Sequence, residues 1–244
     1  MILNLIHLGR TDYTAALELQ KKLVDARYSQ SIGNTLLLLE HPPVLTLGRN
    51  SNRTNILASD EMLSRRGVEI HEINRGGDVT YHGPGQLVGY PIIDLRSFAP
   101  RLGAVEYVRL LEEALIRAAA DFGIPAQRIA GRTGVWTTAG GSIPEKKIAA
   151  IGVHIARGIT SHGFALNVTN DLRDFDLIVP CGISDRSVTS LDLEADLDST
   201  MHPAPNMQNA VHAVAKQFGR VFNSQVLWLD SLADLNIDEA VLPG

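Results

Sequence analysis

Cysteine is almost absent from this chain of 244 residues, which contains only Cys181. A single cysteine excludes an intramolecular disulfide and any zinc site built from several cysteines. The eight histidines form none of the HxH, HxxxH or HExxH spacings from which many metal sites are built. We therefore expect a protein without a metal centre.

Long apolar runs and an excess of positive charge are missing as well. No stretch approaches the roughly 20 apolar residues that span a membrane, and residues 1–13 lack the features of a secretion signal. The net charge is −5 and the pI about 5.9, which argues against nucleic acid as the main partner, because phosphate binding needs a clustered positive surface. These absences predict a cytoplasmic protein with no membrane partner.

Helical and extended patterns alternate along the whole chain. No linker, charge block or repeat divides it, so we predict a single domain over residues 1–244. Helices are expected over residues 11–27, from Ser59, over 103–122 and over 206–222, and strands over 35–40, 44–48 and 225–229. Residues 151–156 and 164–168 alternate at the strand period. The fold class is α/β or α+β, most economically with a mixed sheet.

Residues 75–86, RGGDVTYHGPGQ, combine four glycines with polar side chains. Glycine lets the backbone approach a ligand closely, so the segment suggests a polar cleft floor, while turns and bulges remain the alternative explanation. A dinucleotide-binding loop is excluded, because Gly83, Gly85 and Gly89 follow the spacing GxGxxxG and an extended run follows them. No P-loop pattern occurs in the sequence.

Three further segments could carry chemistry. Lys147 opens a strand of small apolar residues, either as a partly desolvated functional amine or as a solvated strand-start residue. Cys181 lies where an apolar run breaks into a turn, either as a nucleophile or as an inert buried residue. His82 and His162 could each act as an acid or base, donate to an oxyanion, or be structural.

Five motifs, RGGDVTYHGPGQ, GRTGVW, KIAAIGVHI, HGFALN and VPCGI, together resemble the lipoyl(octanoyl) transferase family. The resemblance covers about residues 32–191, whereas residues 194–244 carry no recognised motif. It implies the fold of biotin and lipoate protein ligases, which is class II synthetase-like and has a mixed β-sheet flanked by helices. It also implies an enzyme that moves an octanoyl group from octanoyl-acyl carrier protein to a lipoyl-domain lysine. The implied acceptors are the E2 subunits of 2-oxoacid dehydrogenases and the glycine cleavage H protein, and no cofactor is required.

The resemblance assigns roles to individual residues. It implies that Cys181 forms an acyl-thioester and that Lys147 lowers the pKa of the Cys181 thiol. The implied acyl-pocket contacts are Arg75, Gly76, Gly77, Asp78, Val79, Thr80, Tyr81, His82, Ala150, Ile151, Gly152, Gly163, Phe164 and Ala165. Two alternatives remain: an ATP-dependent lipoate or biotin ligase of the same fold, which needs no cysteine, and a catalytically silent scaffold with Cys181 in its core.

Two expectations concern surfaces around this site. The tetrahedral oxyanion needs hydrogen-bond donors, for which we nominate the residues from Thr160 to His162 and backbone amides near Cys181. Acyl carrier proteins are generally acidic and this chain is acidic overall, so docking needs a local basic patch. The candidates for this patch are Arg49, Arg53, Arg65 and Arg66.

Overall fold

A large sheet with helices on both faces dominates the computed structural model, which describes residues 1–138, 144–179, 187–195 and 201–237. Its eight strands are arranged in the order β11-β1-β2-β6-β10-β9-β8-β7. β1 pairs in parallel with β11 and β2, and every other neighbouring pair is antiparallel. The predicted mixed sheet is therefore confirmed. The bounds are β1 Ile2–Arg10, β2 Asn34–Glu40, β6 Gln86–Ile92, β7 Ala126–Ile129, β8 Arg132–Thr137, β9 Lys147–Ala156, β10 Ile159–Asn167 and β11 Gln225–Trp228.

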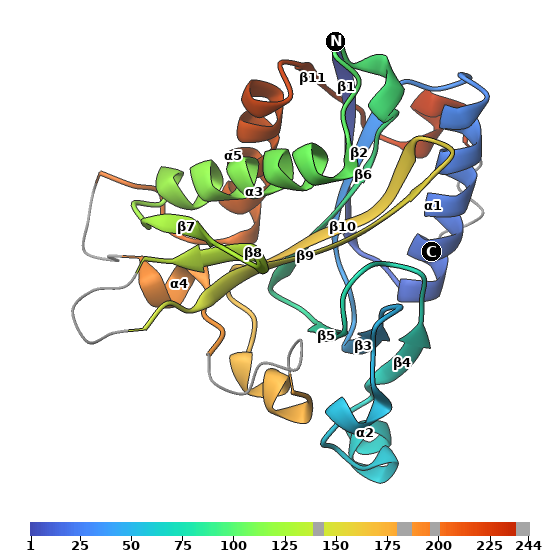
Figure 1. Cartoon of the computed structure of the whole chain (residues 1–244). Coiled ribbons are helices and arrows are strands. Elements are labelled where there is room, and N and C mark those ends of the chain that lie inside the picture. Colours follow the sequence, from blue (N-terminus) through green and yellow to red (C-terminus); the bar gives the residue numbers. More distant parts are fainter. Residues whose placement is uncertain (139–143, 180–186, 196–200, 238–244) are drawn as a thin grey trace.

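The two faces of this sheet are covered by different helices (Figure 1). α1 (Tyr13–Tyr28) packs on one face against β6 and β10, and α3 (Ala104–Asp121) and α5 (Met207–Val221) pack together on the other. α3 buries positions that recur at helical spacing, including Tyr107, Leu111 and Leu115. The sheet therefore lies between two apolar cores, one on each face, and each core is covered by its own helices.

The helix ends lie close to the predicted positions, with one correction. The side chains of Ser59 and Asn206 accept from the amides of Met62 and Asn209, so both residues cap their helices. Thr11 was expected to cap α1, but this was wrong by one residue. The carboxylate of Asp12 accepts from the amide of Ala15 and caps the helix instead.

A second, smaller sheet lies below the first in Figure 1 and carries the glycine-rich segment. Its order is β4-β3-β5, with β3 Val44–Leu47, β4 Glu69–Glu72 and β5 Val79–His82. Its apolar core includes Leu45, Tyr81 and Phe175, the last from η3 (Leu172–Leu177). The remaining helices are η1 Arg53–Asn55, α2 Asp60–Arg65, η2 Leu95–Ser97, α4 Leu191–Glu194 and η5 Leu232–Leu235. Within the ranges given above, no helix has the length and apolar character needed to cross a membrane.

Candidate active site

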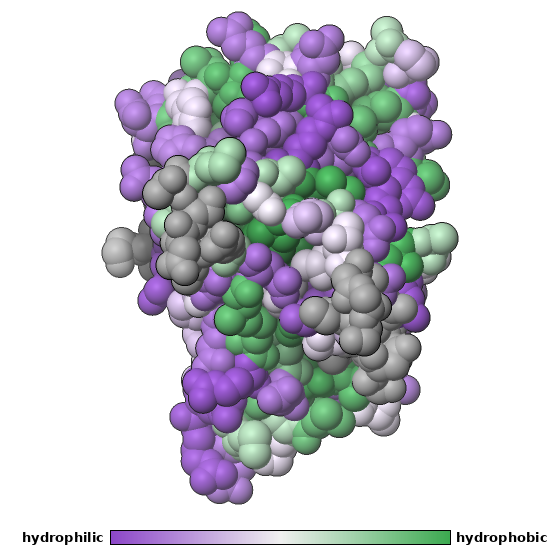
Figure 2. Space-filling model, turned by 90° about the vertical axis from the view of Figure 1, so that its left-hand side faces the viewer, coloured by the Kyte–Doolittle hydropathy of each residue, from purple (hydrophilic) through white to green (hydrophobic). Residues whose placement is uncertain are grey.

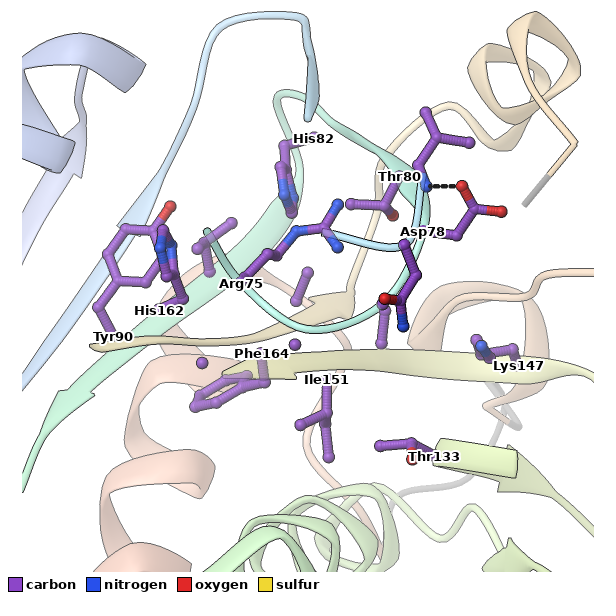
Figure 3. Close-up of a pocket in the computed structure, with 18 of the residues that line it drawn as sticks. Arg75, Asp78, Thr80, His82, Tyr90, Thr133, Lys147, Ile151, His162 and Phe164 are labelled. Carbon is purple, nitrogen blue, oxygen red and sulfur yellow. Dashed lines mark hydrogen bonds between the residues drawn. The ribbon is translucent and has the colours of Figure 1, made fainter. Parts of the chain in front are cut away.

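A cavity of about 420 Å³ lies between the two sheets. Figure 3 shows that its walls come from the segment between β4 and β5, from β5 itself and from β6, β8, β9 and β10. Of the predicted pocket residues, twelve line it: Arg75, Gly77, Asp78, Val79, Thr80, His82, Ala150, Ile151, Gly152, Gly163, Phe164 and Ala165. Lys147 lines the same cavity. Residues from four motifs that are far apart in the sequence therefore surround one space.

Arg75 and the glycines after it form one wall of this cavity. The Arg75 guanidinium is buried and donates from Nη2 to the carbonyl and hydroxyl oxygens of Thr46 on β3, over 2.7 and 2.8 Å. The amide of Gly76 donates to the carbonyl of Val153 on β9 over 2.9 Å. Gly77 has a φ of +90°, which favours glycine. This wall is thus hydrogen-bonded to both sheets, through β3 and through β9.

Gly76 and Tyr81 were predicted as pocket contacts but are not among the residues that line the cavity. Tyr81 alternates with Thr80 and His82 along β5, so it points into the core of the small sheet. There its hydroxyl donates to the carboxylate of Asp174 over 2.6 Å. Its position is therefore explained by packing rather than by contact with the cavity.

A cluster of histidine and tyrosine side chains closes one end of the cavity. His41 donates from Nδ1 to the carbonyl of Thr11 over 2.7 Å, because a carbonyl can only accept. His41 Nε2 therefore accepts from the hydroxyl of Tyr90, also over 2.7 Å. Tyr13 packs edge-on against His41, and both tyrosines line the cavity. The Tyr90 hydroxyl hydrogen is consequently committed to His41, and only its oxygen can accept from a ligand.

His82 and His162 both line the cavity and are neutral at pH 7. Burial lowers the pKa of His82 to about 3 and that of His162 to about 4. The amide nitrogen of Gln86 donates to Asn167, so the amide oxygen Oε1 is the Gln86 atom that faces His82. An amide oxygen only accepts, and His82 Nδ1 therefore donates to it over 2.7 Å. His162 Nε2 bonds Asn74 Oδ1 over 2.8 Å. Such low basicity suits hydrogen bonding better than general-base catalysis.

The nomination of Thr160 as an oxyanion donor was wrong. Its hydroxyl donates to the carbonyl of Pro91 over 2.6 Å, and its amide donates to the carbonyl of Ile93 over 3.0 Å. Both donors are used inside the sheet, and Thr160 is absent from the cavity wall. The amide of His162 likewise donates to Gln20 Oε1. The backbone amides nominated near Cys181 lie outside the described residues.

Lys147 reaches the cavity through an irregularity in the sheet. Val135 of β8 is paired with Ala149 of β9, but the next residue, Trp136, is paired with Lys147. One extra residue of β9 lies between these two pairs. Such irregularities re-aim side chains and occur often beside active sites. A regular register would place Ile148 opposite Trp136, so the shift decides which side chain stands there.

Cys181 lies outside the described residues, as does the rest of the segment 180–186, but its neighbours in the sequence are placed. The amide of Val179 donates to the carbonyl of Asn55 over 2.7 Å. The side chain of Asn55 donates in turn to the cavity residue Asp78 over 2.6 Å. On the other side, the carbonyl of Ser187 accepts from the amide of Lys147 over 3.1 Å.

Several residues that line the cavity were not predicted as pocket contacts. They are Tyr13, Asn50, Val88, Tyr90, Gly131, Arg132, Thr133 and His162. The GRTGVW motif contains three of them and could have indicated that part of the wall. Nothing in the local sequence of α1 or β6 identifies Tyr13 or Tyr90 as a cavity residue. Among the residues that the structure describes, no group of three or more His, Cys, Asp or Glu side chains could hold a metal ion.

Comparison with known proteins identifies the relatives of this chain. Residues 12–219 match the family described as lipoyl protein ligase A/B catalytic domain. A protein of Acidobacterium capsulatum named octanoyltransferase is 72% identical over 247 residues, which cover 99% of each chain.

Solved structures share the fold at low identity. A bipartite lipoate protein ligase from Thermoplasma acidophilum, studied with its E2 lipoyl domain, matches with a TM-score of 0.69 and 16% identity, over 95% of this chain and 87% of that one. Biotin protein ligase from Aquifex aeolicus, in complex with biotin and ATP, matches with a TM-score of 0.51 and 16% identity, over 90% and 70%. These likenesses confirm the predicted fold class.

Proposed function

Since the chain belongs to the lipoyl protein ligase A/B catalytic domain family and is an acyltransferase enzyme that transfers octanoyl groups in protein lipoylation, we propose that it works through an acyl-thioester on Cys181. The donor in this proposal is octanoyl-acyl carrier protein. The acceptors are the lipoyl-domain lysines of 2-oxoacid dehydrogenase E2 subunits and of the glycine cleavage H protein.

The ligase alternative is not favoured. Relatives that are 72% and 56% identical over nearly the whole chain are named octanoyltransferase. The likeness to lipoate and biotin protein ligases is at 15–16% identity and concerns the fold alone. A silent scaffold is disfavoured by the same relatives, because they are named as enzymes and match this chain along nearly its whole length.

The observation that carries the proposed mechanism is the position of Lys147. It lines the cavity together with the three segments expected to hold the acyl chain. Val179 stands two positions before Cys181 in the sequence. Val179 is hydrogen-bonded to Asn55, which in turn bonds Asp78 in the cavity wall. These hydrogen bonds are compatible with a Cys181 thiol beside the Lys147 ammonium.

The chemistry has two balanced steps. In the first, the Cys181 thiolate attacks the carbonyl of the carrier thioester and the bond from this carbonyl to the carrier sulfur breaks. The Lys147 ammonium gives its proton to the departing sulfur, so the carrier leaves as a thiol and Lys147 becomes neutral. A free thiol has a pKa of about 8.5, so a nearby ammonium is needed to make thiolate the major form at neutral pH. In the second step, the acceptor amine attacks the enzyme thioester, Lys147 takes the proton of the amine, and the Cys181 thiolate leaves.

The donor and the acceptor approach the protein from its surface. Figure 2 shows the face on the left of Figure 1, where apolar surface lies in the middle and the upper part is hydrophilic. In the predicted basic patch, Arg65 pairs with Glu61 at 3.8 Å and Arg66 with Asp174 at 3.3 Å. These acids offset part of the positive charge, so Arg49 and Arg53 are the stronger candidates to steer an acidic carrier.

The decisive experiment tests the covalent step directly. The protein is mixed with octanoyl-carrier, without ATP, magnesium or acceptor, and its intact mass is measured. We expect one added octanoyl group that maps to Cys181, is removed by neutral hydroxylamine, and is discharged onto a lysine when an apo lipoyl domain is added. A protein that stays unmodified even with trapping at low pH contradicts the covalent mechanism. Modification only with free octanoate and ATP would indicate a ligase.

A further inference from the structure

The indole of Trp136 lies directly beside the lysine that the proposed function uses. Trp136 on β8 and Lys147 on β9 are cross-strand partners, and the Lys147 ammonium lies over the indole ring, 4.8 Å from its centroid. The guanidinium of Arg132 also lies over this ring, at 6.0 Å. Cations within about 6 Å of an aromatic centroid are attracted by the negative face of the ring. Both cations belong to the cavity wall.

The local backbone is arranged to allow this contact. Gly134, two residues before Trp136, has a φ of +121°, which L side chains rarely adopt. A Cβ atom at this position would lie 2.7 Å from the carbonyl oxygen of Ala149 and 3.5 Å from Cε of Lys147. The missing side chain therefore lets the backbone of β9 approach β8 closely, with the stem of Lys147 at an ordinary contact distance. The register shift described above then brings Lys147 opposite the indole.

The N–H group of Trp136 does not explain the choice of tryptophan at this position. Trp136 is 2% exposed, and its Nε1 is a buried donor for which the described part of the chain supplies no hydrogen-bond acceptor. A buried donor without an acceptor destabilises the folded state, and phenylalanine would avoid this cost but fill less of the buried space. Besides its volume, tryptophan offers the more negative ring face, which binds cations best. The two cations over the indole point to this ring face as a property that the site uses.

From this geometry we infer that Trp136 is a positioning residue for acyl transfer: its indole face holds the Lys147 ammonium in the orientation that stabilises the nucleophilic thiolate. The inference rests on the proposed function, in which Lys147 acts on Cys181. Trp136 touches neither the acyl chain nor the thiol in this role. It acts through Lys147, so its effect should appear in the pH dependence of the thiol.

The test replaces Trp136 by fluorinated tryptophans, which weaken the negative face of the ring with little change in size. The chain has two tryptophans, and Trp228 is exposed on the edge strand β11, so a Trp228→Phe background confines the fluorine to position 136. Because Cys181 is the only cysteine, the rate of alkylation by iodoacetamide reports on one thiol. The rate is measured against pH for the unfluorinated, monofluoro and trifluoro proteins and for Lys147→Ala.

We expect the pH midpoint of alkylation to rise with each step of fluorination, by about half a pH unit in total, towards the midpoint of Lys147→Ala. Trp136→Phe should lie between the unfluorinated protein and Lys147→Ala, with circular dichroism as a check on folding. If Lys147→Ala shifts the midpoint but fluorination leaves it unchanged or lowers it, the inference about Trp136 is overturned and the role of Lys147 stands. If Lys147→Ala leaves the midpoint unchanged, the role of Lys147 falls and the inference falls with it.

Discussion

The contact between Gly152 and the Arg75 wall allows a sharp test of how the cavity is built. A Cβ atom added at position 152 would lie 2.8 Å from the carbonyl oxygen of Gly76 and 3.0 Å from Cδ of Arg75. Cβ atoms essentially never lie under 3.0 Å from a heavy atom of a distant residue. Gly152→Ala must therefore push the Arg75 wall away from β9. The hydrogen bond from the Gly76 amide to Val153 would be strained with it.

The magnitude follows from the size of this clash. Inserting a methyl group into a packed site costs about 1–3 kcal/mol, and the smaller conformational entropy of unfolded alanine offsets about 0.4–1 kcal/mol. We therefore expect Gly152→Ala to lower the free energy of unfolding by about 1–2 kcal/mol. If the displaced wall also loses its fit to the octanoyl chain, kcat/KM should fall by about tenfold or more, since 1.4 kcal/mol corresponds to a factor of ten.

The matched control lies on the other side of the same contact. A Cβ atom at Gly76 would meet only the carbonyl oxygen of Val153, at an ordinary 3.5 Å. Gly76→Ala should therefore raise the free energy of unfolding by about 0.4–1 kcal/mol, because only the smaller conformational entropy of unfolded alanine changes. Urea unfolding of both variants, together with octanoyl-transfer kinetics of Gly152→Ala, gives the comparison. Equal stabilities for the two variants would refute the tight packing of the wall on β9. An unchanged kcat/KM in Gly152→Ala would show that the displaced wall keeps its fit to the octanoyl chain.

Three further outcomes are expected. Cys181→Ser should leave circular dichroism unchanged and abolish transfer, because serine is a far weaker nucleophile; activity above about a tenth of wild type would reject the assignment. Gly89→Ala should destabilise the fold by about 1–3 kcal/mol, because its Cβ clashes with the Phe164 ring, and Phe164→Leu in the same chain should recover part of the loss in urea unfolding; strict additivity would contradict the clash. The folded pKa of His82, about 3, lies below its unfolded value of 6.5, so the unfolded state binds more protons and stability falls as pH drops from about 6.5 towards 4. His82→Gln should make the pH dependence of the unfolding free energy shallower by about 1.4 kcal/mol per pH unit near pH 5, and an unchanged slope would show that His82 is charged in the folded state.

Local sequence was sufficient for the elements whose pattern is strongly periodic. The helix predicted over residues 103–122 is α3 with its two caps, Gly103 and Phe122, because apolar positions at helical spacing and a terminal Gly123 act within one segment. The strands predicted over residues 35–40 and 44–48 are β2 and β3. The N-terminal strand β1 was not predicted. Its residues bury side chains on both faces of the sheet and therefore show no clean alternation.

The resemblance of the motifs identified most of the cavity wall, whereas the remaining contacts were decided by tertiary structure. Tyr13, His41 and Tyr90 come from segments separated by about 30 to 50 residues. They meet because α1 packs against β6, which carries Tyr90, and because His41 directly follows β2, the neighbour of β6 in the sheet. Such contacts depend on which strands become neighbours, and no local pattern encodes that choice.

Register is the second property that only the folded sheet decides. The sequence predicts that Lys147 opens a strand, but a strand by itself does not say which residue of its neighbour it will face. One extra residue in β9 opposite β8 brings Lys147 against Trp136. Because side chains alternate between the two faces of a sheet, a slip of one residue would exchange Lys147 for Ile148 at this position. The sequence determined which residues can perform the chemistry, and the pairing of the strands determined which of them meet.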